Sequence, residues 1–207
     1  MRFGNEPARD SPTQGPLPKG DRNANPALPL FDLLAEDFRT HGSRLLAPGF
    51  WALAVHRFGN WRMGMPAIVR PPFTLTYRAA YRAVIALWGI DLPYNVKLGR
   101  RFRLDHHGCV HIGALAIGDD VVIRHTATIG LSRRTERTTA PTLGDRVEVG
   151  PGACIVGGIN IGDDCYVGPN TVVAQSMAPH TTALGVPARI VSLAAVLADP
   201  PASRSKV

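Results

Sequence analysis

Four histidines fall between residues 106 and 125 of this 207-residue chain, and their side chains are the ones best suited to proton chemistry near neutral pH. They are His106, His107, His111 and His125, and the first of them follows Asp105. A neutral imidazole can accept the proton of a hydroxyl group while its oxygen attacks an acyl carbon, which is general-base catalysis. About three neutral histidines can instead hold a zinc ion with one open position. The five-residue separation of His106 and His111 suits such a site, so these residues alone leave both interpretations open.

A six-residue repeat positions these histidines. An aliphatic residue returns every six positions, a glycine often follows it, and a compact or aliphatic residue comes four positions later. An α-helix does not accommodate a strict repeat of six with so many glycines. A coil of three flat strands does, because each repeat supplies one strand whose aliphatic side chain points inward. The repeat predicts a parallel β-helix of about four coils with the inward residues Leu98, Leu104, Val110, Ile117, Ile123, Ile129, Leu143, Val149, Ile155, Ile161, Val167 and Val173.

The register of the repeat places two histidines on one edge of this β-helix. His106 and His125 each stand third in the second repeat of a coil. Because adjacent coils stack about 5 Å apart, the two imidazoles should lie next to each other. Pro151 and Pro169 occupy the same position in the next two coils. One column of the β-helix is therefore predicted to carry these four residues.

Segments of different composition flank the repeat. Residues 1–27 hold five prolines and little apolar content, which predicts a disordered tail. Residues 28–95 show mostly helical apolar spacing interrupted by prolines, which predicts an α-helical N-terminal domain of three or four short helices. We expect the β-helix over residues 96–178, with residues 131–142 leaving it as a loop excursion of the kind that often carries function. Residues 179–207 are expected to form a C-terminal segment with a GVPAR turn and a flexible tail.

Positive charge is concentrated before the repeat. Residues 28–103 contain eleven Lys and Arg against four Asp and Glu, whereas residues 104–177 contain five against eight. Aromatic residues alternate with these arginines, a mixture that suits peripheral association with an anionic membrane; solvated arginines on an amphipathic helical domain are the simpler interpretation. No motif indicates a nucleic-acid partner. The chain has no apolar signal segment, no long apolar run and an odd number of cysteines, so we expect a cytoplasmic protein, or one at the inner face of the membrane.

The repeat resembles that of the hexapeptide-repeat acyltransferases, and within them residues 90–191 are similar to the serine acetyltransferase family. The stretches that carry the resemblance are IDLPYNVKLGRRFRLDHHG (90–108), IGDDVVIRHTATIG (117–130), VGPGACIVGGINIGDD (149–164), HTTALGVPARIV (180–191) and, in the helical region, GFWALAVHRFGNW (49–61). The similarity is greatest to the serine-acetyltransferase-like enzymes of exopolysaccharide synthesis. It implies an all-β left-handed parallel β-helix behind an α-helical N-terminal domain, a homotrimer, and acetyl-CoA as co-substrate, with no metal.

The resemblance also implies a set of site residues. His106 matches the general base of the family and Asp91 matches the aspartate that orients it, which implies a catalytic pair. Asp105 and His125 are further candidates for the active site. The candidate cofactor-binding residues are Gly130, Leu131, Gly150, Pro151, Gly168, Pro169, Gly185 and Arg189. In the loop excursion, Arg133, Arg134 and Arg137 are candidates to bind an anionic acceptor or the coenzyme phosphates.

Two departures from the family fall on the acceptor side. Where the family has Arg-His-Pro at the end of the large loop, this chain has Thr139, Ala140 and Pro141, and RTHGSRLLAPGF lacks the family's Asp-Pro pair. We therefore expect an acetyl-CoA-dependent O-acetyltransferase whose acceptor is a sugar hydroxyl in cell-surface polysaccharide synthesis, with L-serine as the alternative. His106 would deprotonate the hydroxyl for direct attack on the thioester. A zinc enzyme of the γ-carbonic-anhydrase type and a non-catalytic scaffold are the less favoured alternatives.

Overall fold

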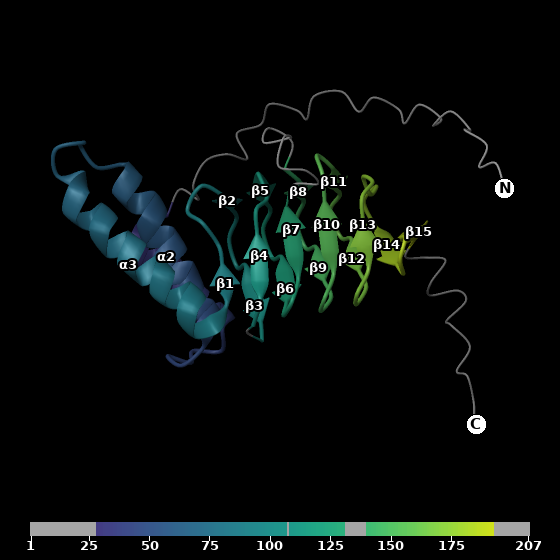
Figure 1. The fold of residues 1–207 in the computed structure, drawn as a ribbon, viewed down its shortest axis with the longest axis horizontal. Helices are drawn as coiled ribbons and strands as arrows, with labels where there is room; N and C mark the ends of the chain where they lie inside the picture. Colours follow the sequence, from purple (N-terminus) through teal and green to yellow (C-terminus); the bar gives the residue numbers. More distant parts are fainter. Residues whose placement is uncertain (1–27, 107, 131–139, 193–207) are drawn as a thin grey trace.

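The protein is a β-helix with three α-helices packed at its N-terminal end (Figure 1). The structure is a computed structural model that describes residues 28–106, 108–130 and 140–192. The helices are α1 (Leu30–Thr40), α2 (Pro48–Met63) and α3 (Arg70–Trp88). Proline lies in the first turn of α2 and of α3, where a missing N–H costs no hydrogen bond, and Gly89 ends α3 with a left-handed φ of 65°. The helical N-terminal region predicted from the sequence is confirmed.

Three mainly parallel sheets form the faces of the β-helix. Sheet A consists of β1 (Ile90–Asp91), β4 (Val110–Ile112), β7 (Thr128–Gly130), β10 (Cys154–Val156) and β13 (Val172–Val173). Sheet B consists of β2 (Lys97–Leu98), β5 (Ala116–Ile117), β8 (Thr142–Leu143) and β11 (Asn160–Ile161). Sheet C consists of β3 (Arg103–Asp105), β6 (Val122–Arg124), β9 (Glu148–Val149), β12 (Tyr166–Val167), β14 (Thr181–Leu184) and an antiparallel last strand, β15 (Arg189–Ser192). The chain passes from A to B to C in each coil, and the predicted left-handed β-helix of about four coils is confirmed.

The core of the β-helix is the column of aliphatic side chains that the repeat predicts. All twelve inward residues named above are at most 5% exposed, and residues four positions after them, such as Val121, Ala127 and Val147, are completely buried. Burying apolar surface contributes about 25 cal/mol per Å², so each added coil stabilises the stack below it. The core continues into the helical region through Leu53 and Ala52 of α2.

Aspartates at one set of turns link each coil to the next. The Oδ1 atom of Asp119 accepts a hydrogen bond from the Arg100 N–H at 2.8 Å. Asp145 accepts from the Asp119 N–H and Asp163 accepts from the Asp145 N–H, both at 2.9 Å. These side chains satisfy backbone donors that the turn would otherwise leave without a partner. We refer to Asp119, Asp145 and Asp163 as the aspartate ladder.

Helix α2 attaches the helical region to the first coil through polar side chains. The buried His56 places Nε2 at 2.9 Å from the Val96 carbonyl oxygen. The buried Arg57 donates to the carbonyl oxygens of Leu98 and Gly99 at 2.9 and 2.6 Å. These carbonyls lie at the first edge of the β-helix, where no earlier coil is present to bond them. The helices therefore cover the open end of the stack.

The segment boundaries differ in detail from the sequence-based expectations. Strand β1 begins at Ile90, inside the range expected to be helical, because Ile90 and Asp91 pair with β4. Strand β8 begins at Thr142, whose N–H donates to the Ile159 carbonyl oxygen, so this residue belongs to the β-helix and not to the loop excursion. The C-terminal segment adds β14 and β15 to sheet C. The expected tail over residues 1–27, most of the excursion and the flexible end lie outside the described residues.

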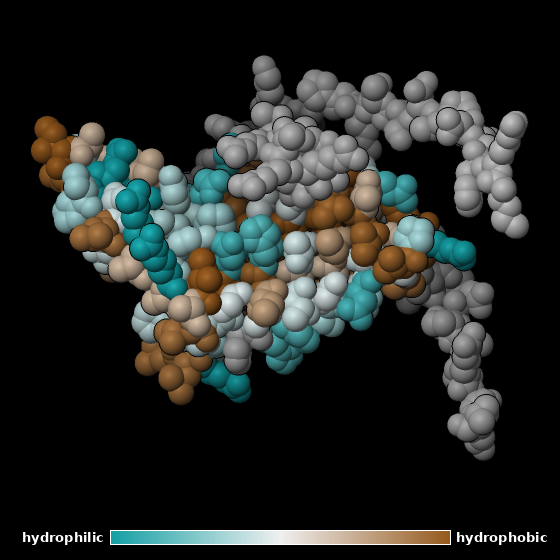
Figure 2. All heavy atoms as spheres, in the orientation of Figure 1, coloured by the Kyte–Doolittle hydropathy of each residue, from teal (hydrophilic) through white to brown (hydrophobic). Residues whose placement is uncertain are grey.

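Exposed apolar side chains gather on the helical region. Figure 2 shows brown, hydrophobic groups at the ends of the helices, whereas much of the β-helix surface in that view is pale or teal. The most exposed large apolar residues there are Phe31, Leu46, Ile68, Leu75 and Leu87, each at least 70% exposed. Within the described ranges, no helix is long and apolar enough to cross a membrane.

Candidate active site

The turn from sheet C to sheet A, which we call the C–A corner, collects the predicted histidines. His106 directly follows β3 and His125 directly follows β6, one coil further on. Their ring centroids are 5.7 Å apart in an edge-to-face arrangement, which confirms the stacking predicted from the register. Hydrogen bonds continue the column: the Gly152 N–H donates to the His125 carbonyl oxygen, and the Asn170 N–H donates to that of Pro151. The predicted column of two histidines and two prolines is therefore present.

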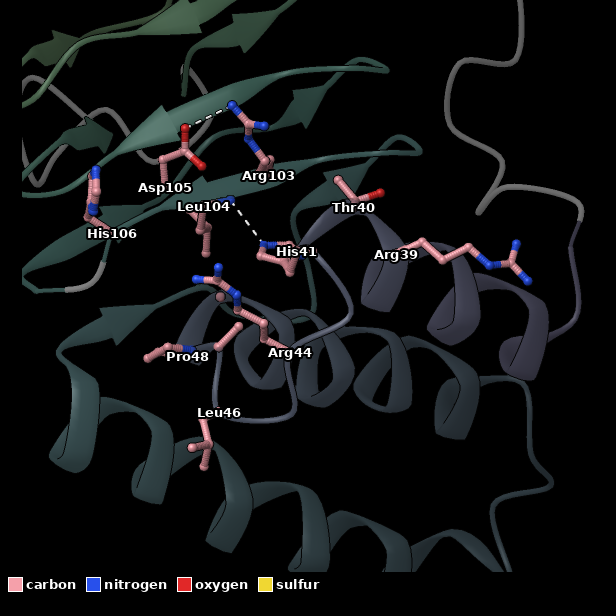
Figure 3. A pocket seen from close by; sticks show the side chains of 13 residues that line it. Arg39, Thr40, His41, Arg44, Leu46, Pro48, Arg103, Leu104, Asp105 and His106 are labelled. Carbon is pink, nitrogen blue, oxygen red and sulfur yellow. Dashed lines mark hydrogen bonds and ion pairs between the residues drawn. The ribbon is translucent and has the colours of Figure 1, made fainter.

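A pocket of about 620 Å³ lies beside His106, between the α1–α2 connection and β3 (Figure 3). Gly49, near the start of α2, permits this close approach, because a Cβ there would lie 2.7 Å from His41 Nε2 and 2.9 Å from the Leu104 carbonyl oxygen. Both sides of the pocket carry charged or titratable groups. The lining residues are Arg39, Thr40, His41, Gly42, Arg44, Leu46, Ala47, Pro48, Gly49, Arg103, Leu104, Asp105 and His106.

The charges in this pocket are of both signs. The Asp105 carboxylate accepts a hydrogen bond from Arg103 Nη2 at 2.9 Å. In Figure 3 the Arg44 side chain extends between Pro48 and Leu104 towards the β-helix, whereas Arg39 points away from His106. Neither of these two arginines has an ion-pair partner among the described residues. The pocket therefore offers a carboxylate, an uncompensated guanidinium and an imidazole to a small ligand.

His41 holds the two sides of the pocket together. Its Nδ1 lies 2.8 Å from the Asp37 carbonyl oxygen, and its Nε2 accepts a hydrogen bond from the Leu104 N–H at 3.3 Å. Burial is the main reason that the pKa of His41 is lowered below its usual value of 6.5. The imidazole therefore stays neutral near pH 7, as an acceptor from Leu104 requires.

Asp91 does not contact His106, which contradicts the pairing implied by the family resemblance. Its Oδ2 atom lies 2.8 Å from His111 Nδ1, and its Oδ1 atom accepts a short hydrogen bond from the Tyr81 hydroxyl. The physical reason is the strand register, which sets Asp91 of β1 beside His111 of β4, whereas His106 lies before β4 begins. Among the described residues, the ring of His106 contacts only His125.

The candidate cofactor-binding residues divide between two corners of the β-helix. Gly150, Pro151, Gly168 and Pro169 lie on the C–A corner, on the same column as His125. The Gly185 N–H donates to Thr171 Oγ1 at 3.1 Å, which places the GVPAR turn on this corner, with Arg189 beginning β15 just after it. Gly130 instead ends β7, at the other edge of sheet A. Leu131, Arg133, Arg134 and Arg137 lie outside the described residues.

Sequence reasoning missed several of the site residues. The helical-region residues Arg39, His41 and Arg44 gave no signal beyond positive charge, and Tyr81 looked like an ordinary core position of an amphipathic helix. The partner of Asp91 could have been found, because one coil of about 20 residues separates Asp91 from His111. For the zinc alternative, no group of three His, Cys, Asp or Glu side chains is placed to hold a metal ion in the part of the chain that the structure describes; His107 lies outside it.

Comparison with known proteins gives consistent relatives. Residues 140–175 match the family model described as bacterial transferase hexapeptide (six repeats). A serine acetyltransferase of Mycobacterium tuberculosis is 37% identical over 145 residues, which cover 70% of this chain and 61% of that relative. A serine acetyltransferase of Helicobacter pylori is 36% identical over 149 residues, which cover 72% of this chain and 84% of that relative. The chain thus spans less than two thirds of the mycobacterial protein and most of the one from Helicobacter.

A solved structure agrees with these relatives. Soybean serine acetyltransferase complexed with serine superimposes with a TM-score of 0.67 at 30% identity, and the match covers 78% of this chain and 69% of that chain. The match extends well beyond the repeat region found by the family model, because 78% of this chain is more than the 36 residues from 140 to 175.

Proposed function

Because the chain belongs to the serine acetyltransferase family of hexapeptide-repeat acyltransferases, we propose that it transfers the acetyl group of acetyl-CoA to the side-chain hydroxyl of L-serine. The observation that carries this proposal is the pocket beside His106, which combines one carboxylate, arginines and an imidazole. An amino acid carries an ammonium group and a carboxylate, and serine adds a hydroxyl. A pocket with complementary groups for all three suits this substrate better than a neutral sugar.

Each part of serine has a candidate partner in the pocket. The Asp105 carboxylate is placed to accept hydrogen bonds from the ammonium group, after sharing or releasing its bond to Arg103. Arg44, which lacks an acid partner among the described residues, is placed to bind the carboxylate. Arginine suits this role because its planar guanidinium can donate two parallel hydrogen bonds to a carboxylate. The hydroxyl would then face His106.

We assign the general base to His106. Its imidazole accepts the hydroxyl proton while the serine oxygen bonds to the thioester carbonyl carbon. The carbon–sulfur bond then breaks, and the imidazolium returns the proton to the coenzyme thiolate, giving O-acetylserine and coenzyme A. No further reactant is needed. His125, whose ring is 5.7 Å from that of His106, supports the base by packing against it.

Acetyl-CoA is the co-substrate in this proposal, and the C–A corner is its candidate binding surface. Pro151, Pro169 and the GVPAR turn form a continuous column that leads towards His106. Glycines precede both prolines, so backbone groups there are accessible to an extended pantetheine chain.

The acceptor is the point at which we depart from the sequence-based expectation of a sugar. The relatives from Mycobacterium, Helicobacter and soybean all carry the name serine acetyltransferase, and the soybean structure is a complex with serine. These names favour serine, which was the alternative. The missing Asp-Pro pair is compatible with this choice, because Asp105 and Arg44 offer the charges that an amino acid needs.

The assembly and the membrane association expected from the sequence remain proposals. The family resemblance supports a homotrimer with active sites between neighbouring β-helices. The exposed Leu75 and Leu87 of α3, together with Arg78 and Arg82 on the same helix, support contact with an anionic membrane surface. Mass in solution tests the first proposal, and sedimentation with anionic vesicles tests the second.

Release of coenzyme A thiol from acetyl-CoA tests the proposed function. We expect release that depends on L-serine and is lost by at least about a hundredfold in His106→Ala, as is typical when a general base is removed. His180→Ala is the matched control, because His180 is 72% exposed and lies at the far end of the β-helix. A panel of sugar acceptors is run in parallel.

The outcomes separate the candidates. Turnover with sugars but not with serine would overturn the proposed acceptor and restore the sequence-based expectation. Turnover with serine that is equal in wild type and His106→Ala would overturn the assignment of the base. Failure to bind acetyl-CoA at all would overturn the acyltransferase proposal and favour the scaffold.

A further inference from the structure

Three residues from three elements form a hydrogen-bonded chain on the outer face of sheet A. They are Tyr81 of α3, Asp91 of β1 and His111 of β4. The Tyr81 hydroxyl donates to one oxygen of Asp91, and the other oxygen lies 2.8 Å from His111 Nδ1. Burial, and after it the bond to Asp91, raises the pKa of Tyr81, so its hydroxyl keeps the proton that it donates.

This chain fixes the tautomer of a neutral His111. An ionised carboxylate only accepts hydrogen bonds, so Nδ1 must carry the proton that faces Asp91. Nε2 is then left with a free lone pair. The His111 side chain is 52% exposed, and no second hydrogen bond to it is found among the described residues. The protein therefore presents a hydrogen-bond acceptor of fixed direction to the outside of sheet A.

The surface beside this acceptor is kept free of side chains. A Cβ atom at Gly113 would lie 3.3 Å from His111 Nε2, and one at Gly130 would lie 3.8 Å from it. Gly113 directly follows β4 and Gly130 ends β7, so the two glycines are neighbours at one edge of sheet A. The result is a small flat shelf with one oriented acceptor. Such a surface suits an extended ligand chain that offers an N–H group.

We propose that His111 is part of the coenzyme-binding site, where Nε2 accepts a hydrogen bond from an amide N–H of the pantetheine chain. This inference rests on the proposed function, because it takes acetyl-CoA as the co-substrate. Pantetheine is extended and carries two amide N–H groups, which match the shelf and its acceptor. Asp91 then acts as a positioning residue for coenzyme binding through His111 and has no direct role in proton transfer by His106.

Asp91→Asn provides a specific test of this arrangement. The Tyr81 donor favours the amide oxygen on its own side, so the amide NH₂ of the new side chain faces His111 Nδ1. That nitrogen must then accept, and the proton moves to Nε2, which becomes a donor and no longer accepts from an amide. Nitrogen-15 NMR of the imidazole distinguishes the two tautomers without any measurement of activity.

Calorimetric titration with coenzyme A measures the consequence for binding. We expect His111→Ala and Asp91→Asn each to weaken binding about fivefold to tenfold, the worth of one hydrogen bond. The double variant should bind no more weakly than either single variant, because both changes remove the same interaction. The KM for serine should stay unchanged, and His180→Ala should bind as the wild type does.

Three results would overturn the inference. The first is unchanged coenzyme affinity in a folded His111→Ala variant. The second is an Asp91→Asn effect that is non-additive with His106→Ala but additive with His111→Ala, which would return Asp91 to the base. The third is retention of the Nδ1–H tautomer in Asp91→Asn. Failure of the proposed function is a distinct result: serine would not be acetylated even though coenzyme binding depended on His111.

Discussion

The guanidinium of Arg57 and the carboxylate of Asp37 form a completely enclosed ion pair between α2 and α1. Arg57 Nε lies 3.0 Å from Asp37 Oδ2, and the two side chains are 1% and 0% exposed. The other two guanidinium nitrogens donate to Leu98 and Gly99 in the first coil. One residue thereby joins both helices to the β-helix, and α1 leads directly into the connection that lines the pocket.

Arg57→Ala is predicted to destabilise the protein by about 3–5 kcal/mol, because it leaves the buried Asp37 carboxylate without its partner. It also leaves two first-coil carbonyls without a donor. Urea unfolding measures the change. Glu36→Gln is the matched control: Glu36 pairs with Arg100 between the same regions, but at a partly exposed site, and such pairs contribute about 0–1 kcal/mol. Equal losses in the two variants would contradict the special role of burial.

The sequence was sufficient for the β-helix and for the stacked histidines. Each repeat must bury one aliphatic side chain, so its period determines the faces of the coil and the register that brings His106 beside His125. The predictions were less complete where the contact depends on two structural regions. The pocket exists because Gly49 allows α2 to approach β3 and because His41 bonds to Leu104, and no periodicity encodes either contact.

The pairing of Asp91 is the instructive error. The sequence resemblance assigned it to His106 by a separation of 15 residues, whereas the strand register assigns it to His111. A hydrogen-bond partner in a β-helix is determined by the coil above or below, so the separation of about one coil is the informative quantity. Tyr81 completes the arrangement from a helix, which the repeat does not describe.

His56 is predicted to make the stability of the protein pH-dependent. Burial is the main cause that lowers the pKa of His56 from 6.5 to about 3 in the folded state. Between these values the unfolded chain binds a proton that the folded protein does not, so the free energy of unfolding rises with pH. The slope for one proton is about 1.4 kcal/mol per pH unit, and the effect is complete above the unfolded pKa.

Urea unfolding between about pH 5 and pH 8 measures this slope in a range where carboxylates stay ionised. His56→Gln should reduce the slope, because glutamine can still donate to the Val96 carbonyl but does not titrate. A residual slope of the same sign is expected from His41, whose pKa is also lowered. The exposed His180 serves as the control site, and His180→Gln should keep the wild-type slope. An unchanged slope in His56→Gln would refute the assignment.

The aspartate ladder predicts a difference between two substitutions at one position. Asp145→Ala removes the oxygen that accepts from the Asp119 N–H, which should cost about 1 kcal/mol, the typical worth of one hydrogen bond. Asp145→Asn keeps an acceptor oxygen in the same place and should cost clearly less. The melting temperatures of the two variants decide the question. If the asparagine variant melts as low as the alanine variant, charge rather than hydrogen bonding stabilises these turns.

Arg44 is predicted to determine the affinity for the acceptor. Its guanidinium extends into the pocket and has no acid partner among the described residues, so it is available for the serine carboxylate. A hydrogen bond between charged groups contributes about 1.5–3 kcal/mol, which corresponds to at least about a tenfold change in binding. Arg44→Gln should therefore raise the KM for serine about tenfold or more while the KM for acetyl-CoA stays unchanged. Arg39→Gln is the control, because Arg39 lines the same pocket but points away from His106. Equal KM values for serine in Arg44→Gln and wild type would show that another cation binds the carboxylate, and Arg103 would be the next residue to replace.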